Sequence, residues 1–290
     1  MNVETPRHAV VARYLAFVKF EHTLFALPFA YGGMLLAAGG WPGWRVFVLV
    51  TMAMVGARSA AMALNRVIDA RLDAVNPRTR EREIPAGRLR RRDGLLLAAV
   101  GLVLLAVAGA LLNPLTLALL PVAVLFLSLY PYLKRFTWLC HFWLGATIGA
   151  AAAGGWIAVT GAFSLTAVAL WLAVASWIAG FDIIYGVLDL RFDRRVGLHS
   201  IPARFGVRRA LLVSAAAHLV SFTALFGVLL WSRLGWPYPV ALAGTAAVLL
   251  YEQIAVRRLE PAVVLRSFNA NLVVGLLILL GIVGGLALRG

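Results

Sequence analysis

The chain has 290 residues, of which 62% are hydrophobic and only 13% are charged. This composition excludes a water-soluble globular fold of the same size. A formal net charge of +15 would indicate nucleic acid as the partner of a soluble protein, but a chain this hydrophobic has the lipid bilayer as its partner, and we expect no nucleic-acid binding. The single cysteine, Cys140, permits neither an intrachain disulfide nor a thiolate metal site.

Apolar stretches recur along the whole chain, and each is long enough to cross the roughly 30 Å hydrocarbon core of a bilayer as a helix. We predict nine transmembrane helices, at 24–40, 45–64, 95–112, 115–130, 138–160, 165–185, 210–231, 237–256 and 269–288. The third and fourth are separated by Asn113 and Pro114, and because proline interrupts a helix they should form a tight hairpin. The predicted fold is an all-α integral membrane protein with one domain over residues 1–290.

The 27 Lys and Arg residues are divided unequally between the two sides that this helix count defines. Most fall in the N-terminal tail and in the loops 65–94, 131–137, 186–209 and 257–268, which share one side. On the other side stand Arg45, Arg233 and Arg289. Because cytoplasmic loops carry the excess of Lys and Arg, we expect a cytoplasmic N-terminus, an outside C-terminus and a multi-pass position in the cell's inner (cytoplasmic) membrane.

Five of the six aspartates lie in two series, which open the cytoplasmic loops 65–94 and 186–209. In the first series, Asn65, Asp69 and Asp73 are four residues apart and therefore share one face of a helix. An amide and two carboxylates should thus point in the same direction at the membrane surface.

The second series consists of Asp182, Tyr185, Asp189 and Asp193, at intervals of three, four and four residues. At 100° per residue these side chains lie along one stripe of a helix, with Asp182 deepest in the membrane. An ionisable side chain inside a membrane is costly and marks a functional site by default.

Two facing stripes of carboxylates would repel each other unless a cation lay between them. Oxygen ligands favour a hard ion such as Mg²⁺, which typically shares its coordination shell with the phosphates of a substrate. A diphosphate is therefore the predicted partner, and its remaining charge requires cations. The adjoining loops supply Arg78, Arg82, Lys134, Arg135 and Arg204 as candidate substrate-binding residues.

Simpler interpretations apply to single members of these groups. Any one aspartate beside an arginine, such as Asp193 beside Arg194, could form an ordinary salt bridge at a helix end, but this does not explain five aspartates at these spacings. The basic segment 88–92 is typical of an anchor to anionic headgroups. We interpret His8 and His218 as structural residues.

At these residues the sequence resembles the UbiA superfamily of intramembrane prenyltransferases, whose motifs are close to NxxxDxxxD and DxxYxxxDxxxD. Further segments resemble the branch that prenylates aromatic acids: Glu21-His22-Thr23, Asn76-Pro77-Arg78-Thr79, Pro85-Ala86-Gly87, Tyr130-Pro131, Lys134-Arg135-Phe136-Thr137 and Gly197-Leu198-His199-Ser200-Ile201-Pro202. The resemblance covers nearly the whole chain and includes the helix count.

Members of this family bind a polyprenyl diphosphate through Mg²⁺ held by the aspartates, with the prenyl tail in a lipid-facing tunnel. The resemblance implies that Asp69, Asp73, Asp189 and Asp193 are catalytic, metal-bridging residues, and that Asn65, Asp182 and Tyr185 complete the pocket. Arg66 departs from the ubiquinone-type motif, which often has aspartate there, and removes one carboxylate from the first series.

The chemistry implied by the resemblance is electrophilic aromatic substitution, in which an allylic carbocation alkylates a ring carbon beside a phenol. Asp182, or a base near it, would deprotonate the acceptor or the ring. We expect a 4-hydroxybenzoate-type polyprenyltransferase of ubiquinone or menaquinone synthesis. The segment 197–202 also resembles members assigned to the futalosine route to menaquinone, so the acceptor could be another aromatic acid or a purine-bearing precursor.

Other branches of the family, acting on haem, chlorophyllide, or a glycerol or sugar phosphate, are alternatives with the same diphosphate site. A secondary transporter is the alternative from another class, with acids that bind Na⁺ or H⁺ near the bilayer midplane. The acids here cluster at the predicted cytoplasmic helix ends, which favours an enzyme. The Asp-Gly and Ala-Arg arrangement of CDP-alcohol phosphotransferases is not found.

Overall fold

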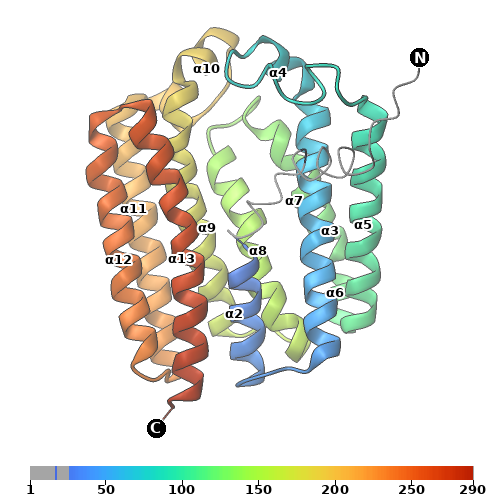
Figure 1. Ribbon diagram of the computed structural model, residues 1–290, viewed down its shortest axis with the longest axis vertical. Coiled ribbons are helices and arrows are strands. Elements are labelled where there is room, and N and C mark those ends of the chain that lie inside the picture. Colours follow the sequence, from blue (N-terminus) through green and yellow to red (C-terminus); the bar gives the residue numbers. More distant parts are fainter. Residues whose placement is uncertain (1–16, 18–25, 290) are drawn as a thin grey trace, which may run out of the picture.

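The computed structural model describes Phe17 and residues 26–289, and the regular elements in this part of the chain are all helices (Figure 1). They are α2 (Leu27–Ala38), α3 (Trp44–Ile68), α4 (Ala70–Val75), α5 (Arg91–Leu112), α6 (Pro114–Ala118), α7 (Leu120–Leu133), α8 (Cys140–Thr160), α9 (Leu165–Gly186), η2 (Val187–Asp189), α10 (Leu190–Val196), α11 (Ile201–Ser232), α12 (Pro237–Ala255), η3 (Val256–Arg258) and α13 (Pro261–Ala287). The His8 position and the segment Glu21-His22-Thr23 lie outside the described residues.

Seven of the described helices are long and apolar enough to cross a membrane, which confirms an all-helical membrane protein. The predicted spans 24–40 and 115–130 correspond to the shorter apolar helices Leu27–Ala38 and Leu120–Leu133. The fourth span is shortened because its helix ends at Ala118, and a new helix, α7, begins at Leu120 with a proline in its first turn. The first span begins in residues that are not described.

The expected break between α5 and α6 lies at Asn113 and Pro114. The Asn113 side chain accepts a hydrogen bond from the Thr116 backbone N–H and caps α6, and Pro114 occupies its first turn. The Asn113 amide also donates to the Ile157 carbonyl at 2.8 Å, which ties the hairpin to the end of α8. The predicted hairpin is therefore confirmed.

Helical structure extends further into the charged loops than apolarity alone predicted. The helix α3 continues to Ile68, so that Asn65 lies in its last turn rather than in a loop. The loop 186–209 is largely helical, because η2 and α10 follow α9 directly and α11 already starts at Ile201. Its early start has a local cause, since the Ser200 hydroxyl caps the Ala203 N–H; Gly206, with φ of 80°, then interrupts the helix.

The core of the bundle is built around α9, the most buried of the seven long helices, which packs on α8 and α11. Small residues let these backbones approach closely, as is usual between membrane helices. A Cβ atom on Gly145 of α8 would lie 2.1 Å from the Ala175 carbonyl oxygen of α9, and one on Gly155 would lie 2.0 Å from the Ala30 oxygen of α2. The absence of side chains at these glycines therefore sets the spacing of the central helices.

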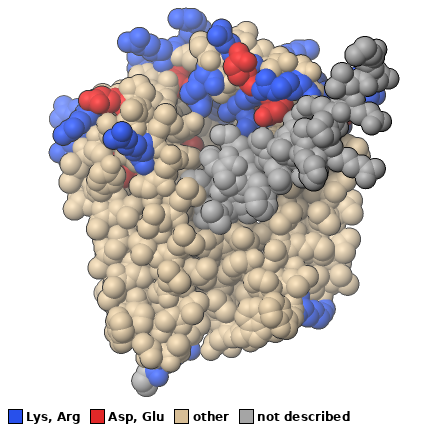
Figure 2. Space-filling model, viewed as in Figure 1, with Lys and Arg blue, Asp and Glu red and all other residues tan. Residues whose placement is uncertain are grey.

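Charged side chains gather at one end of the bundle, over α4 and α10, while the belt below is almost free of them (Figures 1 and 2). We call this the charged end; it comprises residues 69–90, 134–139, 187–200 and 256–260. Both aspartate series reach it, because α3 and α9 run in the same direction through the bundle (Figure 1). The fold thus brings two segments more than one hundred residues apart to the same surface.

The close contact between α8 and α9 generates a stability prediction with a matched control. Gly145→Ala should lower the free energy of unfolding by about 1–3 kcal/mol, since its methyl group would collide with a backbone carbonyl. Gly154→Ala, in the same helix, places the same methyl group in open space and should leave stability unchanged or slightly raised. Thermal unfolding in detergent measures both, and equal melting temperatures would contradict the packing account.

Candidate active site

The first aspartate series lies at the elbow between α3 and α4. The Asn65 amide donates to Asp69 Oδ2 at 3.1 Å. The Asp69 N–H donates to the Asn65 carbonyl at 2.9 Å and the Asp73 N–H to the Asp69 carbonyl at 2.8 Å. The four-residue periodicity therefore persists through the elbow, although Asp69 itself belongs to neither helix.

The second series follows the end of α9 into η2 and α10, and the loop after the first series reaches over to it. Arg78 Nε donates to Asp189 Oδ1 at 2.9 Å, and its Nη2 forms an ion pair with Asp189 Oδ2, so the contact is a two-pronged fork. Arg78 Nη1 also donates to the Tyr185 hydroxyl at 2.7 Å. The Asn76 amide donates to Asp189 at 3.4 Å. Arg78 and Asn76 thus connect the loop that follows the first series to the second series.

The first series has its own cationic partners. Arg82 Nη1 lies 2.8 and 2.9 Å from the two oxygens of Asp73, and Arg135 Nη2 lies 2.8 Å from Asp69 Oδ1. Burial raises the pKa of the Asp69 carboxyl, while the charges of Lys134 and Arg135 oppose this shift. Three of the five predicted cations therefore contact an aspartate directly.

The other two predicted cations lie differently. Lys134 acts on Asp69 through its charge, and its backbone carbonyl accepts the His199 N–H at 2.7 Å. Arg204 lies over the ring of Phe205, 6.0 Å from the ring centroid, and no ion pair joins it to an aspartate among the described residues. Arg204 lies near the start of α11, where the sequence predicted a loop.

Asp182 has a partner that the sequence pattern did not reveal. His141 Nδ1, in the first turn of α8, lies 2.7 Å from Asp182 Oδ2. No regular spacing connects the two residues, which are 41 positions apart.

Asp193, the last member of the second series, is buried, and its Oδ1 has no hydrogen-bond partner.

The carboxylates fit Mg²⁺ by their chemistry but do not form a cage of protein ligands. Among the described residues, no three His, Cys, Asp or Glu side chains lie close enough together to hold an ion. Mg²⁺ needs only one or two carboxylates when phosphate oxygens complete its shell. The buried, unpartnered Asp193 Oδ1 is a free oxygen ligand of the required type. The donor set therefore suits a metal that arrives with a phosphorylated substrate.

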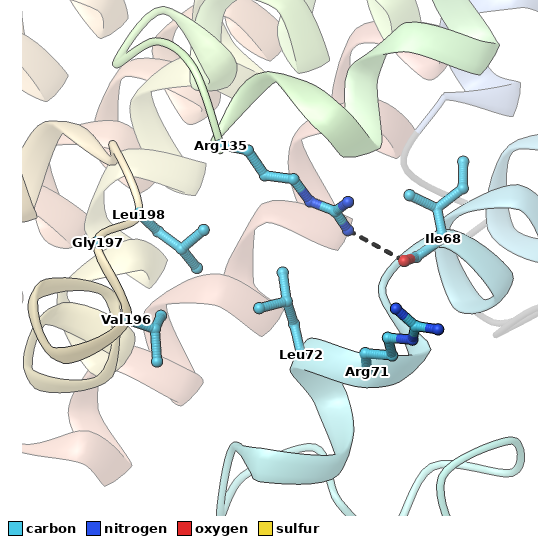
Figure 3. A pocket seen from close by; sticks show the side chains of 7 residues that line it. All are labelled: Ile68, Arg71, Leu72, Arg135, Val196, Gly197 and Leu198. Atoms are coloured by element: carbon cyan, nitrogen blue, oxygen red, sulfur yellow. Dashed lines mark hydrogen bonds between the residues drawn. The ribbon is translucent and has the colours of Figure 1, made fainter.

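An open pocket of about 380 Å³ adjoins the first series, between the elbow and residues 196–198. Its apolar lining comes from Ile68, Leu72, Val196 and Leu198, and its cations are Arg71 and Arg135. Figure 3 shows side chains of the elbow and of the 196–198 segment on opposite sides of this space, with Arg135 bridging above it to the Ile68 carbonyl at 3.0 Å. Such a lining suits a small molecule with an apolar body and an anionic group.

Comparison with known proteins agrees with this geometry. The model of the UbiA prenyltransferase family matches residues 26–286. A 4-hydroxybenzoate octaprenyltransferase of Xanthomonas campestris is 36% identical over 258 residues, which cover 88% of this chain and 84% of that protein. One of Vibrio parahaemolyticus is 29% identical over 254 residues, covering 86% of this chain and 87% of the relative.

Solved structures share the fold as well. The apo structure of a UbiA homolog from Aeropyrum pernix superposes with a TM-score of 0.83 at 38% identity, covering 91% of this chain and 97% of that one. A UbiA homolog from Archaeoglobus fulgidus bound to DMAPP and Mg²⁺ has a TM-score of 0.69 at 19% identity, covering 92% and 99%. The family model covers nearly the whole chain and includes all of the helices that carry the two aspartate series. This chain therefore belongs to the UbiA prenyltransferase family and is a membrane-embedded prenyltransferase.

Proposed function

We propose that the protein transfers a polyprenyl group from a polyprenyl diphosphate to an aromatic acid of the 4-hydroxybenzoate type, in ubiquinone or menaquinone biosynthesis. The observation that carries this proposal is the Arg78 fork, in which an arginine from the loop after the first aspartate series contacts Asp189 and Tyr185 of the second. The names of the relatives, 4-hydroxybenzoate octaprenyltransferases, support the acceptor class.

In this proposal Asp69, Asp73, Asp189 and Asp193 would hold Mg²⁺ together with the diphosphate. The Mg²⁺-bound and DMAPP-bound structure of the Archaeoglobus homolog supports a divalent metal and a prenyl diphosphate at this fold. When bound, the metal supplies positive charge to the leaving diphosphate. Arg78, Arg82 and Arg135, which now neutralise carboxylates, would then contact phosphate oxygens.

The reaction breaks the allylic C–O bond, and its electron pair leaves with the diphosphate. The prenyl carbocation is attacked by a ring carbon beside the phenol, and the ring then loses the proton from that carbon to restore aromaticity. We assign the acceptance of a proton to Asp182. A site within a membrane suits this chemistry because it keeps water away from the carbocation.

The proposal includes an orientation in the membrane. With α2 and α6–α7 counted as crossings, the chain would cross the membrane nine times. The charged end would then lie in the cytoplasm and the C-terminus outside. The excess of Lys and Arg at the charged end supports this assignment (Figure 2). The acceptor would enter from the cytoplasmic side of the inner membrane, and the pocket beside Arg71 would receive its carboxylate.

Purified protein in detergent, supplied with geranyl or farnesyl diphosphate and 4-hydroxybenzoate, should form a prenylated product with Mg²⁺ and none with EDTA. Asp69→Ala and Asp189→Ala should each lower the rate about 100-fold or more, because each removes charge that holds the metal and diphosphate. Asp93→Asn is the control, since Asp93 belongs to neither series: it caps α5, a bond that the Asn side-chain oxygen preserves, and otherwise forms only an ion pair with Arg92 at 3.8 Å.

The outcomes of this experiment separate the acceptor from the reaction class. Diphosphate release without a prenylated acid would mean that the acceptor is another molecule, and other aromatic acids would be tested next. A protein that leaves every prenyl diphosphate intact would contradict the prenyltransferase mechanism.

Arg78→Met should weaken the binding of the prenyl diphosphate about 10-fold or more, because it removes the guanidinium that, in this proposal, leaves Asp189 and Tyr185 to contact phosphate oxygens. Arg80→Met is the control, since Arg80 lies two residues away on the same loop and pairs only with the exposed Glu81. The dissociation constant of geranyl diphosphate with Mg²⁺ measures both, and equal losses in the two variants would point to a general charge effect instead.

A further inference from the structure

We infer that His141 is a positioning residue that fixes the orientation of Asp182 at the reaction site. The inference rests on the proposed function, in which Asp182 accepts a proton. His141 is itself buried, with 7% of its side chain exposed, whereas 25% of the Asp182 side chain is exposed. The imidazole therefore stands behind the carboxylate and not in front of it.

Hydrogen bonding fixes the tautomer of the His141 ring. Its Nε2 lies 3.3 Å from the Ile201 backbone nitrogen, and a backbone N–H can only donate. Nε2 must then be the unprotonated acceptor, which leaves the proton on Nδ1. Consequently Nδ1 donates to Asp182 Oδ2 at 2.7 Å.

Three helices hold the ring in place. His141 belongs to the first turn of α8, and Asp182 belongs to α9. Ile201 is in the first turn of α11, where N–H groups lack a partner within the helix, and the ring satisfies one of them. Gly186 closes the remaining side, since a Cβ atom there would lie 3.1 Å from His141 Cε1. The ring therefore has little freedom to rotate, and its hydrogen bond holds Asp182 in a fixed orientation.

This arrangement leaves Asp182 with one oxygen committed and one available. Oδ2 is occupied by His141, and the exposed part of the carboxylate lies one helical turn from Tyr185, which Arg78 contacts. A carboxylate held by a single fixed donor keeps its other oxygen in one direction, which a proton acceptor requires. A role thus follows for His141, although its spacing in the sequence carries no signal.

A buried His and Asp pair could also serve only to pack α8 against α9, and two variants distinguish the roles. In His141→Asn the amide nitrogen occupies the Nδ1 position and can still donate to Asp182, but it cannot reach Ile201. In His141→Gln the amide reaches the Nε2 position and can accept from Ile201, but the donor to Asp182 is lost. Both variants remove the ring and keep a neutral amide, so their packing defects are comparable.

We expect kcat for prenyl transfer to fall about 10- to 100-fold in His141→Gln, and His141→Asn to retain most of it. Binding of geranyl diphosphate with Mg²⁺ should stay near the wild-type affinity in both, because neither His141 nor Asp182 is a proposed metal ligand. In an Asp182→Asn background, which itself lacks the base, His141→Gln should cause little further loss.

Equal kcat values for His141→Asn and His141→Gln, or additive losses with Asp182→Asn, would overturn the inference. Nitrogen-15 NMR of labelled histidine gives a readout independent of turnover: the signals that His141→Asn removes should be those of an Nδ1-protonated ring, and an Nε2-protonated ring would also overturn it. A failure of the proposed function would be distinct, since the wild-type protein would then release no diphosphate from any donor.

Discussion

The need to neutralise carboxylates at the membrane boundary governs the charged end of this protein. A buried carboxylate without a partner is costly, and removing one member of a buried ion pair leaves that cost uncompensated. Asp69 and Asp189 each receive an arginine from a segment distant in the sequence, and Asp73 receives Arg82 from the loop that follows α4. These pairs therefore hold the loops of the charged end over the bundle.

The helical architecture could be predicted from the sequence because it follows from local properties. Long apolar stretches must be helical in a bilayer to satisfy their backbone groups, and Pro114 marks a break that no neighbour can repair. The predicted start of the helix was wrong where a polar segment is itself helical. The segment 201–209 is polar and was expected to be loop, but capping by Ser200 starts α11 there.

The candidate site was only partly predictable, for a physical reason. The four-residue spacing of the aspartates is a local pattern, and the elbow preserves it through Asp69. Which arginine meets which aspartate depends on how the loops cross the bundle, and the sequence contains no such information. Arg78 and Arg204 were equivalent candidates in the sequence, yet Arg78 pairs with Asp189 and Arg204 lies over the ring of Phe205. His141 had no signal at all, since its function depends on contacts from two other helices.

The pairing of Asp69, Asp73 and Asp189 with arginines also bears on how a membrane site can accept a highly charged substrate. In the proposed reaction, a metal approaching Asp189 competes with Arg78, and the guanidinium that it displaces is already within reach of the diphosphate that accompanies the metal. Charge is then exchanged between neighbours rather than brought into the membrane, so neither the empty nor the loaded site carries a large uncompensated charge. Asp182 stands outside this exchange because its partner is an imidazole held in place by a backbone N–H. In the proposed reaction, Asp182 is bound neither by a guanidinium nor by the metal, and it is therefore the carboxylate that can accept a proton.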